Sequence, residues 1–413
     1  MAREMKHSGI EWIGEIPKNW GIRKLKNVSE INSGEYISKE DYVLEGTFDI
    51  IGSNGKIGKI NKTNISKKVI TTGRVGSIGT SRIVQNAWVT DNALTIEAKK
   101  NILLDYLVYI IPMFPYEIIS SGTAQPLITA TVLKNQYIPY SSLCDQQKIA
   151  DFLGEKCAEL DNMLEKTHTS IVEYKKLKQA VITQAVTKGI RDDREMKDSQ
   201  STWFGQIPID WGMRKIKYIF KIQKDIAGEE GHTVLSITQK GIKPKDLTKN
   251  EGQLAENYSN YQLVHMGDFA MNHMDLLTGW VDVSKCEGVT SPDYRVFRLI
   301  DKDKYYSKYY LYLMQMCYTN RIFYGLGQGV SGLGRWRLQA DKFLNFPITV
   351  PSYEEQEEIA NYLEQKCSAI DELISKKEQY LSEIENYKKS LIYEYVTGKR
   401  EVIESNRSMK YNK

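Results

Sequence analysis

Two sets of polar side chains in glycine-rich segments have residue types that suit contact with nucleic acid. Arginine, asparagine, glutamine and aspartate can pair with base edges in the major groove of DNA, and lysine and arginine also bind phosphates. The first candidate set is Asn54, Lys56, Arg74, Ser77, Thr80, Arg82 and Gln125. The second candidate set is Asn272, His273, Asp275, Thr278, Gln328, Arg335 and Arg337. For each residue, the alternative is a solvated loop position or a turn-forming residue.

The sequence contains no clear motif for a catalytic or metal centre. The segment "GSNGKIGKI" resembles a phosphate-binding loop, but it has one residue too many before Gly58-Lys59, and Ile60 follows where a magnesium ligand is needed. We interpret this segment as a glycine-rich turn. Pro292-Asp293 begins like a nuclease carboxylate motif, yet no Asp/Glu-x-Lys follows nearby. The N-P-P-[YFW] tetrapeptide of amino-methyltransferases is absent, and the five histidines have no metal-ligand spacing.

The bulk properties are typical of a water-soluble protein with more than one domain. The chain has 413 residues, of which 41% are apolar and 26% charged. Its five cysteines form no C-x-x-C pair, so we expect free, buried thiols without a disulfide framework or a zinc site. No apolar run approaches the roughly 20 residues that span a bilayer, and "MAREMKHSGI" lacks a signal-peptide core. We therefore expect a cytoplasmic protein.

The net charge of +4 is unevenly distributed along the chain. Residues 1–142 hold 17 basic and 13 acidic side chains, and residues 191–352 hold 22 and 19. Residues 143–190 balance at 7 and 7, whereas residues 353–413 hold 10 and 13. The mild basic excess in two separate blocks permits a polyanionic partner without requiring one.

Internal repeats show that the chain is a duplication. "WIGEIPKNW" from Trp12 returns as "WFGQIPIDW" from Trp203, 191 residues later. "DQQKIADFLGEKCAELD" from Asp145 aligns with "EQEEIANYLEQKCSAID" from Glu355, 210 residues later, and the alignment continues without a gap to the pair Gly189 and Lys399. The second block therefore carries 19 extra residues. The order is block, helical segment, block, helical segment.

Both helical segments are predicted to form long helices of about 44 residues, roughly 65 Å each. Ser142 and Ser352 stand at N-cap positions with a carboxylate three residues later, and Gly189 and Gly398 supply C-terminal stops. Apolar residues recur with alternating spacings of four and three, which predicts a coiled coil. The apolar seam includes Leu153, Leu160, Leu164, Ile171, Tyr174 and Val181 in the first segment and Leu363, Ile370, Ile374, Leu381, Ile384 and Leu391 in the second. The polar exceptions, Thr167 and Lys178 in the first segment and Lys377 and Lys388 in the second, fall at matching places.

The duplication also predicts how the two helices pair. Two equivalent halves related by a two-fold axis make their helices antiparallel, with the two blocks at opposite ends. The alternative is that each helix packs on its own block as a surface helix. We expect strands in the blocks at "KKVITTG", "SRIVQNAWVT" and "NALTIEA", and at "VHMGDFAMN", "GWVDVS" and "YRVFRLI". A helix is expected at "NILLDYLVYII" and at "KYYLYLMQM".

This arrangement resembles the specificity subunit of type I restriction–modification systems. The resemblance rests on the two "W-[IF]-G-[EQ]-I-P-x-x-W" segments, the helix starts "DQQKIA" and "EEQEEIA", and the ends "AVTKG" and "VTGK", and it covers residues 8–400. It implies an α+β fold with two α/β target recognition domains, joined by two antiparallel spacer helices that form a coiled coil, in a pseudo-two-fold internal repeat. The implied bounds are 1–142 and 191–352 for the recognition domains, 143–190 and 353–400 for the spacers, and 401–413 for the tail.

The resemblance also implies a division of labour. Each recognition domain would read one half of a bipartite DNA target, while the helices would set the half-site spacing. Two methylation subunits carrying S-adenosylmethionine, the catalytic part of an adenine-specific DNA methyltransferase, would dock along the spacer and recognition domains. Two restriction subunits would add ATP- and Mg-dependent translocation and cleavage. The chain itself would have no active site and no cofactor.

Two other interpretations stay open at the level of sequence. A coiled-coil scaffold could bind proteins through its two blocks without DNA specificity. A solitary specificity protein could pair with an unusual modification enzyme. The tail "REVIESNRSMKYNK" has no counterpart in the first half, and we expect it to be flexible and to touch the first block near Trp12. Pro17 and Pro208 are expected to fix turns, with the neighbouring Trp side chains packing the start of each block against the block itself or the other half's helix.

Overall fold

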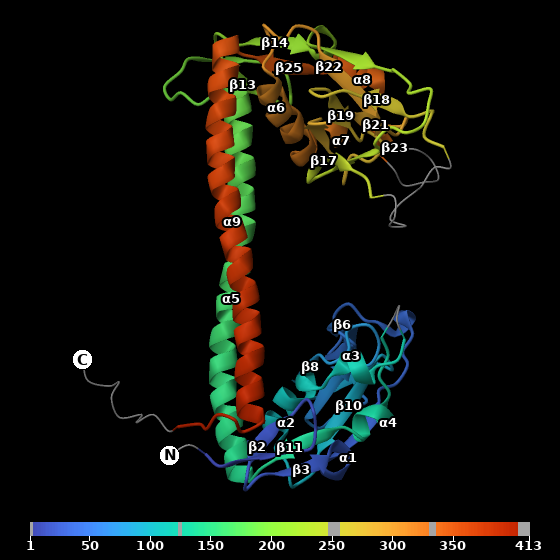
Figure 1. Cartoon of the computed structure of the whole chain (residues 1–413), viewed down its shortest axis with the longest axis vertical. Helices are drawn as coiled ribbons and strands as arrows, with labels where there is room; N and C mark the ends of the chain where they lie inside the picture. The colour runs from blue at the N-terminus through green and yellow to red at the C-terminus, as the bar shows by residue number, and fades with distance from the viewer. Residues whose placement is uncertain (1–2, 123–125, 247–256, 330–335, 404–413) are drawn as a thin grey trace, which may run out of the picture. The chain divides into compact units, whose positions relative to one another are not determined.

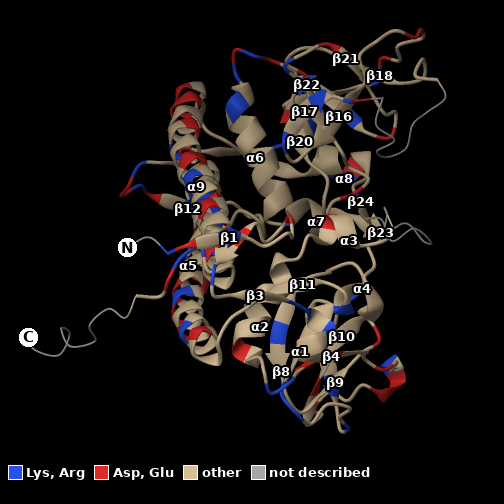
Figure 2. Ribbon diagram, turned by 60° about the horizontal axis from the view of Figure 1, so that its bottom comes forward, with Lys and Arg blue, Asp and Glu red and all other residues tan. Residues whose placement is uncertain are grey.

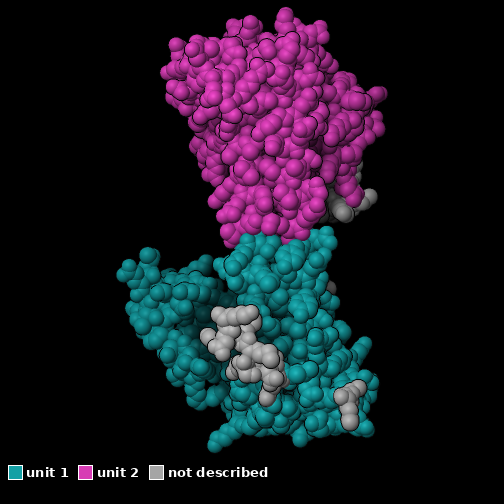
Figure 3. Space-filling view, turned by 90° about the vertical axis from the view of Figure 1, so that its left-hand side faces the viewer, with its two compact units in different colours: residues 1–168, 379–413 teal, residues 169–378 magenta. Residues whose placement is uncertain are grey.

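The computed structural model describes residues 3–122, 126–246, 257–329 and 336–403. The chain forms two compact units, residues 1–168 with 379–413 and residues 169–378 (Figure 3). Unit 1 combines the first block with one half of each long helix, and unit 2 combines the second block with the remaining halves. In the described part of the chain, no helix is both long and apolar enough to cross a membrane.

The two long helices form as the capping residues predict. Helix α5 spans Leu143–Lys188 and helix α9 spans Tyr353–Val396. Ser142 Oγ accepts from Asp145 N at 3.1 Å, and Ser352 Oγ accepts from Glu355 N at 3.3 Å, so both hydroxyls satisfy amides of the first turn. Gly189 and Gly398 adopt φ of 80° and 71°, the left-handed conformation that ends many helices.

Within each unit, α5 and α9 lie side by side and antiparallel, which confirms the predicted pairing (Figure 1). Every predicted seam residue is buried or half-buried. In unit 2, Lys178 Nζ lies 2.6 Å from Asp371 at the seam, and in unit 1 its counterpart Lys388 lies 2.5 Å from Asp161. The matching exceptions Lys178 and Lys388 thus form matching ion pairs. Charges of both signs cover the outer faces of the helices (Figure 2).

The ion pairs of the seam are expected to contribute modestly to stability. Lys178→Glu should lower the free energy of unfolding by about 1 kcal/mol, because it sets a carboxylate against Asp371 on a partly exposed seam. Adding Asp371→Lys should restore most of the loss, as measured by urea unfolding. Lys176→Glu, on an exposed position of the same helix, is the matched control. A double variant no more stable than Lys178→Glu would show that the pair does not stabilise the coil.

The two blocks share one topology, although their loops differ. A four-stranded antiparallel sheet has the order β4-β10-β7-β8 in the first block and β15-β22-β19-β20 in the second. The shared elements of the first block are β1 (Met5–His7), β2 (Glu15–Pro17), β3 (Gly21–Lys24), β4 (Ser29–Ser33), β7 (Val69–Gly73), β8 (Ser81–Val84), β10 (Ala93–Ala98), α2 (Leu104–Ile110), α4 (Ala130–Lys134) and β11 (Tyr137–Tyr140). Those of the second are β12 (Met196–Asp198), β13 (Gln206–Pro208), β14 (Gly212–Lys215), β15 (Phe220–Gln223), β19 (Phe269–Met271), β20 (Val281–Val283), β22 (Arg295–Leu299), α6 (Ser307–Thr319), α8 (Ala340–Asn345) and β25 (Pro347–Val350).

The remaining elements are particular to one block or short. The first block adds α1 (Leu25–Val28), β5 (Phe48–Gly52), β6 (Gly55–Ile60), β9 (Ala87–Val89) and α3 (Tyr116–Ile119). The second adds β16 (Leu235–Thr238), β17 (Gly241–Pro244), β18 (Gln262–Val264), β21 (Gly288–Thr290), α7 (Ile322–Leu326), β23 (Gln328–Gly329) and β24 (Trp336–Arg337). "GSNGKIGKI" forms the turn and second strand of the β5–β6 hairpin, as the glycine-rich-turn interpretation predicts.

Each block is completed by the end of the helix that follows the other block. In unit 1, Tyr106 Oη of α2 donates to Val396 O of α9 at 3.0 Å. In unit 2, Tyr309 Oη of α6 donates to Val186 O of α5 at 3.2 Å. Burial raises the pKa of both phenols, so both stay neutral donors. The surface-helix alternative is therefore incomplete, because the C-terminal end of each helix also packs on the block of the other half.

The repeated Trp segments start both blocks. Trp20 N donates to Pro17 O and Trp211 N donates to Pro208 O, at 2.9 and 3.0 Å, so each proline does begin a turn. Trp20 and Trp211 are fully buried. In unit 1, Trp20 and Pro17 pack against Gly398 after α9, and in unit 2, Trp211 packs against Gly189 after α5. The predicted packing of this segment on the other half's helix is confirmed for these tryptophans.

The two outer tryptophans of the repeated segments differ in burial. Trp12 is partly buried and its ring meets Phe114 edge-on at 5.5 Å, whereas Trp203 is 41% exposed. All five cysteines are free, but Cys144 is exposed and Cys286 is only half-buried, so the expectation of buried thiols holds for the other three. Val402 at the start of the tail packs on the unit 1 core and lines a small cavity with Trp20. Residues 404–413 lie outside the described residues.

Candidate nucleic-acid interface

The first candidate set gathers where the β5–β6 turn meets the loop between β7 and β8. Thr80 Oγ1 donates to Ser53 O and Arg82 Nη2 donates to Asn54 O, both at 3.0 Å. Ser53 Oγ in turn donates to Val75 O at 2.8 Å. These bonds lock the two loops together and leave the Asn54 side chain exposed at the turn.

The other residues of the first set support or flank this junction. Ser77 O accepts from Thr80 Oγ1 at 3.2 Å, and a Cβ added to Gly73 would lie 1.9 Å from Ser77 O, so only glycine fits there. Lys56 Nζ is exposed and lies 2.7 Å from Asp49. Arg74 is half-buried and donates from Nη1 to Asp91 O at 3.3 Å. Gln125 lies outside the described residues.

The second candidate set centres on the loop after β19. Asp275 accepts from Leu277 N at 3.0 Å, from Thr278 N at 3.1 Å and from the Thr278 hydroxyl. Asn272 Oδ1 accepts from Met274 N at 3.2 Å. The side chains thus hold their own loop in shape, which pre-organises the polar edge that it presents.

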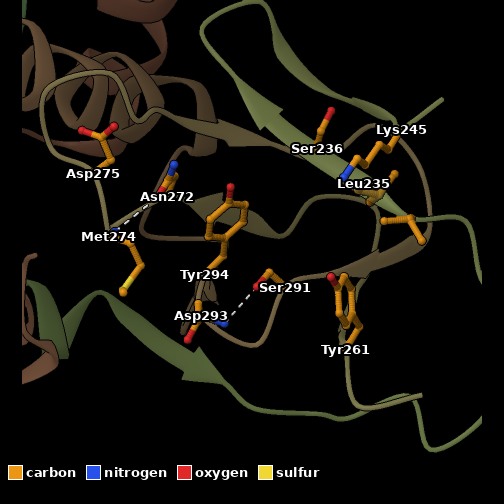
Figure 4. A pocket seen from close by; sticks show the side chains of 11 residues that line it. Leu235, Ser236, Lys245, Tyr261, Asn272, Met274, Asp275, Ser291, Asp293 and Tyr294 are labelled. Carbon is orange, nitrogen blue, oxygen red and sulfur yellow. Dashed lines mark hydrogen bonds between the residues drawn. The ribbon is translucent and has the colours of Figure 1, made fainter. Parts of the chain in front are cut away.

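A cavity of about 530 Å³ opens beside this loop (Figure 4). Asn272 and Asp275 line it on one side and Asp293 and Tyr294 on another, with Lys245 across the opening. Carboxylate and amide oxygens suit the exocyclic amines of cytosine and adenine. The sequence predictions did not include Asp293, Tyr294 or Lys245, because they lie on separate segments that only the sheet and the β16–β17 hairpin bring here.

The remaining residues of the second set lie below or beside the same loop. His273 is 6% exposed, so its ring lies beneath the surface. Its backbone O accepts from Leu338 N at 3.0 Å, which places exposed Arg337 of β24 next to it. Gln328 pairs with Arg337 in the β23–β24 ladder and accepts from Gln339 Nε2 at 2.8 Å. Arg335 lies outside the described residues.

The β7–β8 loop and the β19–β20 loop, which carry part of each candidate set, occupy equivalent positions in the two blocks. Strand β10 pairs with β4 in the same register as β22 pairs with β15, its counterpart in the second block. On the other side, Thr71 of β7 pairs with Thr95 of β10, and Ala270 of β19 pairs with Val296 of β22. Counting along these registers, Arg74 and His273 fall at matching positions just beyond matching strands. Both blocks therefore present these two loops at the same end of equivalent strands. The other described members of the two sets lie on further elements, such as the β5–β6 hairpin and the β23–β24 ladder.

His273 is expected to make stability depend on pH. Burial, with the nearby positive charges of Arg295 and Arg337, lowers the pKa of His273 to about 3. An unfolded histidine takes up a proton below about pH 6.5, and the folded one does not, so stability is lost as pH falls through this window. We expect a slope of about 1.4 kcal/mol per pH unit between roughly pH 6 and 4 that disappears in His273→Gln, measured by urea unfolding. Equal slopes in both proteins would contradict this.

Comparisons with known proteins agree with this architecture. The family model for the type I restriction modification DNA specificity domain matches residues 17–171 and again residues 208–385. The chain is 24% identical over 412 residues to the type I restriction enzyme MjaVIII specificity subunit of Methanocaldococcus jannaschii, covering 93% of each chain. It is 24% identical over 431 residues to the putative type I restriction enzyme MjaX specificity subunit of the same organism, covering 94% of this chain and 95% of the other.

A solved structure shares the fold. A chain from work on complex assembly and conformational transition of the type I R-M system superposes with a TM-score of 0.64 at 13% identity, covering 93% of this chain and 99% of that one. The two family-model matches fall one on each repeat and together span most of the sequence. The chain therefore belongs to the type I restriction modification DNA specificity family, as a DNA sequence-recognition subunit.

Proposed function

We propose that each block reads one half of a bipartite DNA target through the major groove. The first candidate set would contact one half-site and the second candidate set the other. The observation that carries this proposal is that the β7–β8 and β19–β20 loops, which both hold candidate residues, follow equivalent strands in two blocks that each match the specificity family model. The loops differ in sequence and length, as is expected when the two half-sites differ.

The chain works with DNA and with the other subunits of a type I restriction–modification system. We further propose that two methylation subunits dock on α5, α9 and the blocks, and that two restriction subunits join them. S-adenosylmethionine would then bind in the methylation subunits, and ATP and Mg in the restriction subunits. The helices would set the half-site spacing, and the complex would act in the cytoplasm. Membership of the specificity family favours this proposal over a scaffold without DNA specificity.

The decisive test is to map N6-methyladenine in a host genome with and without this gene. We expect methylation at a split motif to disappear when the gene is removed and to return when it is restored. Methylation of the same motif in the absence of the gene would overturn the proposal.

Modularity can be tested with a single exposed residue. Asn54→Ala is expected to relax discrimination at one half-site only, by about 1–3 kcal/mol if the amide reads a base. Gln85→Ala, at an exposed position of the same block, is the matched control and should leave both half-sites unchanged. Competition binding of the assembled methyltransferase to singly substituted target duplexes measures both. Equal relaxation at both half-sites would contradict the assignment of one block to each half.

A further inference from the structure

A cavity of about 310 Å³ beside the start of β22 is lined by three cations. Lys224 after β15, Arg295 on β22 and Arg337 on β24 contribute them. The other described residues that line it are neutral, and no carboxylate is among them. The adjoining cavity of Figure 4, which shares Tyr294, carries Asp275 and Asp293 instead. Two neighbouring hollows of the second block thus differ in charge.

Arg295 is the unusual member, because its charge is buried and no described residue pairs an opposite charge with it. It is 5% exposed, and its Nη2 donates to Leu338 O at 3.0 Å while its guanidinium stacks 4.8 Å from the centre of the Phe343 ring. Its Nη1 is buried and has no hydrogen-bond partner within the part of the chain that the structure describes. Burial lowers the pKa of Arg295 to about 10, so the group is still charged at neutral pH. A buried charge without a counter-ion is destabilising, which is acceptable where a ligand supplies the counter-ion.

Its neighbours cannot supply that counter-ion. His273 lines the same cavity, and its lowered pKa keeps the ring neutral. Arg337 and Lys224 are exposed at the cavity and add positive charge rather than neutralising it. An arginine fork with a second arginine and a lysine beside it is a donor set suited to a phosphate group.

We propose that Arg295, Arg337 and Lys224 hold one phosphate of the DNA backbone of the second half-site. This inference rests on the proposed function and adds a positioning contact to it. A phosphate in the cavity of the three cations places its own nucleotide beside the cavity of Figure 4. There Asn272, Asp275 and Asp293 can accept hydrogen bonds or pair with base amines. Phosphate contacts of this kind set the register of a protein on the duplex without reading sequence.

The test uses the full chain assembled with its methylation subunits. Arg337→Gln and Lys224→Gln are compared with Lys302→Gln, which removes one charge beyond the other end of β22. Each cavity variant should weaken binding by a similar factor on target and on unrelated DNA, and should reduce the slope of log K against log salt by about 0.9. Lys302→Gln should leave the slope unchanged. In wild type, a neutral methylphosphonate at the contacted position should cause the same loss, with no further loss in Arg337→Gln.

Three results would overturn the proposal. The first is an unchanged slope of log K against log salt in both cavity variants. The second is a loss of DNA affinity that is confined to one base sequence. The third is a loss caused by methylphosphonate that adds fully to the loss of Arg337→Gln at every position. Inorganic phosphate, added at constant ionic strength, separates the two sources of the anion. If inorganic phosphate protects the free chain against unfolding, this protection needs Arg337, and the salt slope of DNA binding does not change in the cavity variants, the cavity is assigned to free phosphate.

The buried charge offers a second readout that a structural role would not produce. Arg295→Met should make the DNA-free chain more resistant to urea while weakening DNA binding, because it removes an uncompensated buried charge along with the contact. A variant that loses stability and DNA affinity together would argue for a structural role only. If the wild-type complex shows no preference for a split target, the proposed function fails. The slope of log K against log salt on unrelated DNA would still test the phosphate contact by itself.

Discussion

Replacing Glu355 by alanine is expected to lower the free energy of unfolding by about 3–5 kcal/mol, the largest loss among the single substitutions considered. Its carboxylate is 4% exposed, accepts from Trp211 Nε1 at 2.9 Å and pairs with Arg194, whose other nitrogen lies 2.5 Å from Asp210. Removing the carboxylate leaves a buried indole N–H and a largely buried guanidinium without their main partner. Urea unfolding of the full chain measures the loss.

The first half of the chain supplies a matched control for Glu355. Asp145 is its counterpart, and Arg3 stacks over the Trp20 ring at 5.3 Å as Arg194 does over Trp211 at 6.0 Å. However, Trp20 Nε1 is buried and meets no hydrogen-bond partner among residues 3–403 as described, and a cavity of about 50 Å³ lies between Trp20 and Asp145. Asp145→Ala should therefore cost much less than Glu355→Ala. Asp145→Glu should stabilise the protein by about 1 kcal/mol, because the longer side chain can reach the indole. Equal losses in the two alanine variants would contradict this account.

Replacing either of two buried glutamines by leucine is expected to cost about 2–4 kcal/mol, through unsatisfied backbone groups. Gln146 and Gln356 are fully buried one residue after Asp145 and Glu355. Gln146 Oε1 accepts from Leu103 N at 2.8 Å, and Gln356 Oε1 accepts from Tyr306 N at 2.7 Å. Leu103 and Tyr306 are the N-cap residues of α2 and α6, so each glutamine satisfies an amide at the start of a block helix.

Because their bonds match, the two glutamine variants should lose similar amounts of stability. Gln147→Leu, at the exposed neighbouring position of α5, is the control and should change stability by less than about 0.5 kcal/mol. Urea unfolding at one fixed pH compares all three. A loss in Gln146→Leu or Gln356→Leu as small as that of the control would show that the buried amide bonds do not stabilise the blocks.

Local patterns in the sequence were sufficient for most of the elements. The alternating apolar spacing predicted α5 and α9, and the serine caps and glycines placed their ends to within a residue or two. The strand and helix segments of both blocks also form where their patterns indicate. These features are local, because capping, periodicity and turn chemistry act over a few residues. The duplication then determined the antiparallel pairing, since two equivalent halves related by a two-fold axis require it.

The arrangement of the candidate nucleic-acid interface was harder to predict from local sequence patterns. The structure brings members of each candidate set together, since Arg82 donates to Asn54 O and Asn272 and Asp275 line one cavity, while their contact with DNA stays a prediction. Residue type alone could not show that His273 is buried or that the Thr80 hydroxyl donates to Ser53 O. Arg295 gave a faint signal as a charge inside the apolar run "YRVFRLI", but an edge strand or a solvated face would give the same pattern.

From the sequence alone we could predict the repeat, the long helices, the order of strands and helices, and the family to which the chain belongs. Three features came from the fold of the whole chain: each block closes on the end of the other half's helix, Gln146 and Gln356 cap block helices, and three cations share one cavity. Those features join residues far apart in the chain, as when Tyr106 bonds to Val396. Periodicity shows which face of an element is buried, but the partner of that face depends on how the whole chain folds back on itself.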